Sequence, residues 1–179
     1  MKPGYIPKAD RKKVMLMSDD MRFFSGIATM ARECVMGTAH HYNWVNLGGS
    51  INHPEKGKIA DLSEEINKNV GITDSYVRIY PVDGYGEPNV VRQIMDIEKP
   101  DMIMIFTDPR YWIWFFQMEA EIRKKTPVVY LNIWDCEPAP LYNFPYYDSC
   151  DLLMNISKQT NQLVKNVLTW GGHHFKEIA

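Results

Sequence analysis

The sequence predicts an α/β protein built on a doubly wound sheet of about six mainly parallel strands, with helices on both faces. Short apolar runs alternate along the chain with segments of helical periodicity. The runs 101–106 and 127–132 are almost wholly apolar, which is typical of central parallel strands covered on both faces. Successive strand–helix steps with right-handed crossovers then make this topology the simplest one.

Six segments are rich enough in apolar residues to be strands: 13–17, 42–47, 76–80, 101–106, 127–132 and 151–155. Polar residues occur within 42–47 and 76–80, which favours positions nearer an edge of the sheet.

Helices are predicted between these strands from apolar residues spaced three and four apart. The first stripe consists of Ile27, Met30, Ala31, Cys34 and Val35. The second consists of Ile59, Leu62, Ile66 and Val70. Gly71 is placed to end this second helix, and Asp61 with Glu64 is a candidate capping box at its start.

The remaining helices carry terminal signals of their own. A third stripe, formed by Val90, Val91, Ile94 and Ile97, is opened by Pro88 and closed before Pro100. The stretch 111–124 begins with aromatic residues and ends in cations, which suit a helix C-terminus. Ser157 is a candidate cap for the last helix.

Length and composition limit the class of protein. The 179 residues, 45% hydrophobic and 23% charged, suit one globular domain. We expect a flexible, solvated lead-in at 1–12, a single domain over 13–170, and a tail or the start of an interdomain linker at 171–179. The net charge of -2 gives no general attraction to nucleic acid, so nucleic acid is not indicated as a partner.

The sequence also favours a soluble, cytoplasmic protein. No apolar run approaches the ~18–20 residues that span a bilayer, and residues 1–4 lack the apolar core of a secretion signal. Cys34, Cys136 and Cys150 are odd in number and have no CxxC spacing, which argues against a disulfide framework or a zinc site.

Ligands of open α/β sheets bind at the carboxyl ends of the strands, where the strand order reverses. For a strand order 3-2-1-4-5-6, the loops at that place are 18–26, 107–112 and 134–140. They are polar, contain Gly or Pro, and are not explained by core packing. We therefore predict that the binding site lies there.

Ser25 and Gly26 stand where the first loop enters a helix. A glycine lets a ligand approach the backbone closely, and exposed amides favour an anionic or hydroxyl-rich group. The chain has neither GxGxxG nor GxxxxGK[ST], which disfavours a nicotinamide or P-loop nucleotide. Asp19 and Asp20 are interpreted as solvated carboxylates rather than metal ligands.

Asp108 is the candidate catalytic residue, because a carboxylate at a strand end could accept a hydroxyl proton or orient a polyol. An Asx turn or helix cap is an equally good interpretation. Arg110 beside it, and Asp135 and Glu137 in the fifth-strand loop, are candidate substrate-binding residues.

No metal site is predicted. Adjacent histidines point in different directions, so neither His40-His41 nor His173-His174 resembles an HxxxH metal face. Surface positions are expected for these four and for His53. No histidine is spaced to activate Cys136 as a nucleophile. Trp112 and Trp114 are interpreted as core or interface residues rather than a sugar-stacking platform.

Two segments resemble the N-terminal, acceptor-side domain of GT-B glycosyltransferases, especially the retaining family 4-like enzymes. The first is Ser25-Gly26-Ile27-Ala28, entering the first helix. The second runs from Val129 to Leu168, where YLNIWDCEPAP is followed by Asp151 and Ser157-Lys158. The resemblance covers about residues 13–168.

The resemblance implies the acceptor-binding half of a hexosyltransferase that uses a nucleotide-sugar as co-substrate and needs no metal or cofactor. Gly26 matches the family glycine that approaches the donor phosphates. Thr107-Asp108-Pro109 stands where the family often has a histidine. The paired glutamates of the donor domain are absent, so a missing C-terminal Rossmann-like domain is expected as a partner and the chain alone as inactive.

Other functions stay open from the sequence. One alternative is a self-contained flavodoxin-like or Rossmann-like module that binds a small metabolite without catalysis. Another is a structural or interaction domain, favoured if Tyr111–Phe116 is exposed. The acceptor (sugar, lipid-linked sugar, protein or modified nucleic-acid base), the donor and a homo-oligomeric state are also left open.

Overall fold

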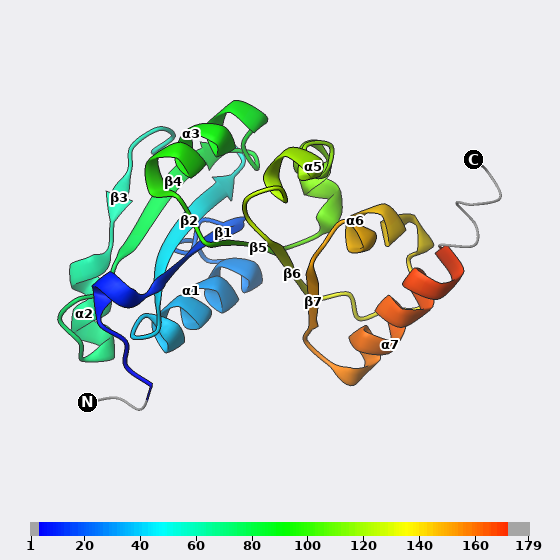
Figure 1. Cartoon of the computed structure of the whole chain (residues 1–179), viewed down its shortest axis with the longest axis horizontal. Helices are drawn as coiled ribbons and strands as arrows, with labels where there is room; N and C mark the ends of the chain where they lie inside the picture. The colour runs from blue at the N-terminus through cyan, green and yellow to red at the C-terminus, as the bar shows by residue number, and fades with distance from the viewer. Residues whose placement is uncertain (1–3, 172–179) are drawn as a thin grey trace. The chain divides into compact units, whose positions relative to one another are not determined.

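The computed structural model describes residues 4–171 and contains a seven-stranded, mostly parallel sheet (Figure 1). The strands are β1 (Lys12–Asp19), β2 (Tyr42–Ser50), β3 (Ala60–Asp61), β4 (Val77–Asp83), β5 (Met102–Phe106), β6 (Val128–Asn132) and β7 (Leu152–Asn155). Their order is β3-β4-β2-β1-β5-β6-β7. Without the short β3, this is the order 3-2-1-4-5-6, so the predicted α/β, Rossmann-like fold is confirmed.

All six predicted strands are present, but β3 was not predicted. It pairs antiparallel with β4 through Ala60 and Asp61. The helix expected from Ile59 therefore begins later, as α2 (Ser63–Val70). The predicted capping box is wrong, because Asp61 accepts a hydrogen bond from the Ser63 amide at 2.9 Å and no side chain caps the helix.

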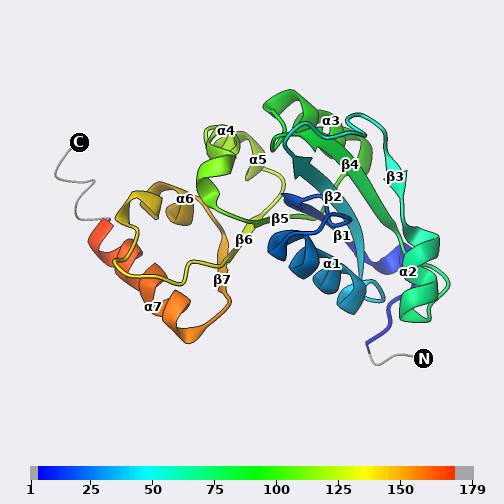
Figure 2. The ribbon, with the colours of Figure 1, turned by 180° about the vertical axis from the view of Figure 1, so that it is seen from behind.

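The chain divides into two compact units, Met1–Met104 and Ile105–Ala179. In the first unit, α1 (Gly26–Thr38) and α2 contact each other on one face of the strands, and α3 (Pro88–Glu98) covers the other face (Figure 1 and Figure 2). The side chains of Val14–Met17 in β1 are buried, as a strand covered on both faces requires. A single domain over 13–170 stays a prediction.

Two helix boundaries of the first unit agree with the prediction, the end of α2 and the start of α3. Gly71 adopts φ 73°, and Pro88 opens α3. The predicted buried stripe of α1 is wrong in part, because Met30 is 48% exposed. The side chains that face the sheet from α1 are those of Ala28, Ala31 and Val35.

In the second unit, β6 and β7 pair in parallel, and α7 (Lys158–Asn166) packs on β7. The expected helix over 111–124 is broken into η2 (Pro109–Trp112), α4 (Ile113–Phe116) and α5 (Glu119–Ile122). The π-helical turn η4 (Val167–Gly171) contacts η3 (Leu141–Asn143) and α6 (Phe144–Asp148).

Two residue-level predictions for the second unit are confirmed. The Ser157 hydroxyl accepts from the Thr160 amide at 3.0 Å and caps α7. Trp112 is completely buried in the core, whereas Trp114 is half-buried.

The residues before β1 are attached to the first unit rather than fully solvated. The Arg11 side chain is buried and pairs with Asp74 at 2.7 Å, and the Tyr5 hydroxyl donates to the same carboxylate at 2.8 Å. Residues 7–10, which include η1 (Lys8–Asp10), are exposed throughout. The predicted tail beyond Gly171, with His173 and His174, lies outside the described residues.

Within residues 4–171, none of the helices combines the length and the apolar character that crossing a bilayer would require.

Candidate functional site

A pocket of about 210 Å³ lies in the second unit, where β5 and β6 end. It is lined by Asp108, Pro109, Tyr130, Asn132, Ile133, Trp134, Asp135 and Cys136. Two of the loops predicted to form the binding site, those after the fourth and fifth predicted strands, therefore meet at one pocket. Its position at the carboxyl ends of parallel strands is the usual one for ligands of this fold class.

Asp108 caps η2 and is held by Arg110. Its Oδ1 accepts from the Arg110 amide at 2.9 Å, and the guanidinium bonds both carboxylate oxygens. Burial of Asp108 opposes ionisation, but these hydrogen bonds outweigh it and lower the pKa of the carboxyl below its ordinary value. The Asx-turn interpretation is thus confirmed. A catalytic role for Asp108 stays a prediction.

The Arg110 guanidinium also lies over two aromatic rings. Its central carbon is 5.9 Å from the ring centre of Trp134 and 5.5 Å from that of Tyr142. The two rings meet edge to face at 6.0 Å. Cation–π contact with both rings helps to hold the Arg110 guanidinium beside Asp108. Of these four residues, Asp108 and Trp134 line the pocket.

Asn132 is the pocket residue with unused hydrogen-bonding capacity. Its side chain is buried, and its Oδ1 accepts from the Trp134 amide at 3.0 Å. Its Nδ2 makes no hydrogen bond of good geometry within residues 4–171, although the Asn132 side chain approaches the Tyr147 hydroxyl closely enough to oppose the raised pKa of that tyrosine. A buried amide group without an acceptor is costly, and a ligand oxygen in the pocket would satisfy it.

Asp135 and Glu137, the two predicted binding residues in the loop after β6, differ in their relation to the pocket. Asp135 lines the pocket with an exposed side chain, and its carbonyl oxygen accepts from Gln159 at 3.0 Å. Glu137 is exposed, precedes a cis peptide bond to Pro138, and is not among the lining residues. The pocket therefore includes Asp135 but not Glu137.

Ser25 and Gly26 belong to the first unit, at the start of α1. The Ser25 hydroxyl donates to Asp19 Oδ2 at 2.6 Å and accepts from the Ala28 amide at 2.9 Å. The Tyr85 hydroxyl donates to the other oxygen of Asp19 at 3.0 Å. A methyl group added at Gly26 would meet no atom within 4 Å, so the backbone there is open to approach.

The loop between β1 and α1 is fixed at both ends. The Met21 amide donates to Asn46 Oδ1 at 3.2 Å, and the Ser25 hydroxyl is bonded to Asp19. Between these anchors, the Phe24 side chain is fully exposed. Whether this loop and the second-unit pocket share one crevice stays a prediction.

A buried charge network lies beneath this loop, and it corrects two predictions. Asp20 is not solvated: its side chain is completely buried and accepts from Arg22 at 2.7 Å and from His53 Nε2 at 3.0 Å. His53 is not on the surface, because its ring lies against that carboxylate. Its Nδ1 accepts from the Glu55 amide at 3.1 Å, which leaves the proton on Nε2.

Within the described range 4–171, no group of three or more His, Cys, Asp or Glu side chains is arranged to hold a metal ion. Comparisons of the chain with protein-family models, with curated proteins and with solved structures found no match.

Proposed function

We propose that this chain is the acceptor-binding part of a glycosyltransferase that moves a sugar from a nucleotide-sugar to an acceptor. The second-unit pocket carries the proposal, because it combines the groups that a saccharide requires. The Trp134 ring, which lines the pocket, offers an apolar surface to the C–H side of a sugar ring. Asp108, Asn132 and Asp135 offer acceptors and one unsatisfied donor to its hydroxyl groups.

In this proposal Asp108 orients an acceptor hydroxyl rather than removing its proton. The hydrogen bonds from Arg110 keep the pKa of Asp108 low despite its partial burial, which makes the carboxylate a weak base. A low-pKa carboxylate still accepts a hydrogen bond from a hydroxyl group. The pocket therefore supplies binding and orientation.

Ser25 and Gly26 would serve the donor. The open backbone at Gly26, where α1 begins, would suit the phosphates of a nucleotide-sugar. Most of the donor site would come from a second Rossmann-like domain, as the resemblance implies. We accordingly expect no appreciable transfer by these 179 residues alone.

The proposal includes a cytoplasmic location. It is supported by the cysteines, because Cys34, Cys136 and Cys150 are unpaired.

Nuclear magnetic resonance of the tryptophan indole groups tests the proposal. Titration of the chain with mono- and disaccharides should shift the signal of Trp134 and leave that of Trp170 unchanged, since Trp170 is exposed and lines no part of the pocket. Trp134→Ala should abolish binding, and Trp170→Ala should not.

Two results would contradict the proposal. One is an unchanged Trp134 signal with every saccharide at millimolar concentration. The other is tight binding of one flavin or free nucleotide, which would favour the self-contained metabolite-binding module.

A further inference from the structure

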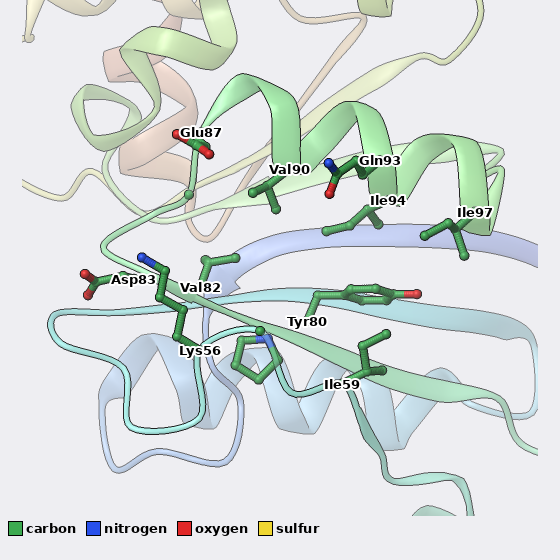
Figure 3. A pocket seen from close by; sticks show the side chains of 13 residues that line it. Lys56, Ile59, Tyr80, Val82, Asp83, Glu87, Val90, Gln93, Ile94 and Ile97 are labelled. Atoms are coloured by element: carbon green, nitrogen blue, oxygen red, sulfur yellow. The ribbon is translucent and has the colours of Figure 1, made fainter.

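A larger groove, of about 460 Å³, lies entirely within the first unit (Figure 3). One wall is α3, and the other is β4 with residues 56–59. The buried lining residues are Tyr80, Pro81 and Val82 on β4 and Ile94 on α3. No interaction used in the proposed function involves this groove, so a role for the groove is independent of that function.

One end of the groove is apolar although it is open to solvent. Ile97 on α3 and Ile59 opposite it are 64% and 56% exposed, and both line the cavity. Tyr80 points its ring between them, as Figure 3 shows. The Tyr80 hydroxyl donates to Glu98 at 2.7 Å, so its polar atom is already satisfied and the ring presents an apolar surface.

The other end gathers charged side chains. Lys56 and Asp83 lie close together there, and Glu87, just before α3, lies apart from them at the same end (Figure 3). Among the residues that the structure describes, neither the Lys56 ammonium nor the Glu87 carboxylate is engaged in an ion pair or a side-chain hydrogen bond. Asp83 uses only Oδ1, which accepts from the His53 and Gly84 amides at 3.3 and 3.2 Å.

These two ends define the chemistry of an occupant. Burying Ile59 and Ile97 under an apolar group would be favourable by the hydrophobic effect. At the polar end, the carboxylates of Asp83 and Glu87 outnumber the single ammonium of Lys56, which disfavours an anionic ligand. The ammonium can donate hydrogen bonds and the carboxylates can accept them, which suits hydroxyl groups. A cavity of 460 Å³ falls within the range of small-molecule sites.

We propose that this groove binds a single amphiphilic molecule with a neutral, hydroxyl-bearing head group. Its apolar chain or ring lies against Tyr80, Ile94 and Ile97, and its head group is held by Lys56 and Glu87. Alkyl or aryl glycosides have this chemistry.

Isoleucine methyl groups provide a direct probe. The protein is labelled at its isoleucine δ1 methyl groups, and the methyl signals are followed by nuclear magnetic resonance. It is titrated separately with octyl glucoside, octyl sulfate and octylammonium, each below its critical micelle concentration. The glucoside should shift Ile59, Ile94 and Ile97 saturably, whereas the exposed Ile113 and Ile156 should stay unchanged. If octyl sulfate or octylammonium bound more tightly than octyl glucoside, the proposal of a neutral head group would be wrong. Equal shifts at Ile113 would show adsorption of detergent and overturn the site.

Two variants block the groove. Val90→Trp fills it from α3 and should weaken binding of the glucoside by about tenfold or more, while Asp96→Trp, on the same helix but outside the lining, should not. Ile97→Glu places a charge at the exposed apolar end, where folding tolerates it, and should weaken binding similarly. Unchanged affinity in a folded Val90→Trp or Ile97→Glu protein would overturn the proposal.

Discussion

The Nε2 atom of His53 lies 3.0 Å from Oδ2 of Asp20, and neither side chain is accessible to solvent. Arg22 bonds the same carboxylate and also pairs with Glu55 at 2.6 Å. The loop that follows β1 is therefore joined to residues 53–55 through a buried carboxylate. Hydrogen bonds from Arg22 and His53 outweigh the burial of Asp20 and lower the pKa of its carboxyl.

Asp20→Asn should lower the free energy of unfolding by about 3 kcal/mol, because it leaves Arg22 and the buried His53 without their shared charged acceptor. Urea denaturation followed by circular dichroism measures the change. Asp10→Asn, at an exposed position in the same unit, serves as the control and should alter stability by less than about 0.5 kcal/mol. Equal stability of the two variants would show that the network contributes little.

Acid should destabilise the first unit through Glu98. Burial alone would raise the pKa of Glu98, but hydrogen bonds from Lys13, Tyr80 and Tyr76 outweigh it and lower the pKa below its ordinary 4.5. Such a carboxylate stabilises the fold at pH values above its unfolded pKa, and this contribution is lost as the pH falls through the folded value.

The free energy of unfolding should therefore stay level down to about pH 5 and then decrease. Glu98→Gln should be less stable at neutral pH and should lose less stability on acidification. Urea midpoints at a series of pH values test this. A variant whose stability falls with pH as steeply as that of the parent would refute the role of Glu98.

Gly26→Ala should leave the fold intact, because the added methyl group meets no atom within 4 Å and the position opens a helix. The free energy of unfolding should stay the same or rise by up to about 1 kcal/mol. Gly49→Ala is the contrasting variant: its methyl group would lie 2.6 Å from the Gly84 carbonyl oxygen, so it should destabilise the protein. Thermal unfolding compares the two.

The same Gly26→Ala protein tests the donor assignment. If phosphates approach the backbone at Gly26, the variant should bind nucleotide-sugar more weakly than the parent in calorimetry despite its intact fold. Equal affinities would remove Gly26 from the proposed donor site.

Arg110→Lys should raise the pKa of Asp108 toward its ordinary 3.8, since a lysine cannot reproduce the two-oxygen contact of the guanidinium. Thermal stability should change little, because the Arg110 side chain is largely exposed and solvent screens its charge. Titration of the Asp108 carboxyl carbon by nuclear magnetic resonance measures the pKa. An unchanged value would mean that Arg110 does not control the charge of Asp108.

Strands were predictable from the sequence because their apolar runs are continuous, as at Val14–Met17. The face of α1 was predicted less well, since Met30 is more hydrophobic than alanine and was therefore assigned to the buried stripe. The observed face uses Ala28 and Ala31, whose small side chains let the helix pack closely on the sheet. The two-residue β3 is too short to leave a periodic signal.

At the candidate site, Asp108 and Asp135 were found because polar residues after buried strands are conspicuous. Asn132 was missed because it is the last residue of β6 and was assigned to a strand rather than to a pocket wall. The contact of Asp20 with His53 joins residues 33 positions apart, and no local pattern encodes such a pair. A histidine next to a proline in a loop is expected on the surface, and only the tertiary structure buries it.

The full exposure of Phe24, between the anchored positions Met21 and Ser25, has a practical consequence. With the exposed Cys136 replaced by serine, a cysteine introduced there could carry a fluorophore or spin label between two hydrogen-bonded positions of the backbone. Such a label would report events at the start of α1 while leaving the surrounding packing undisturbed.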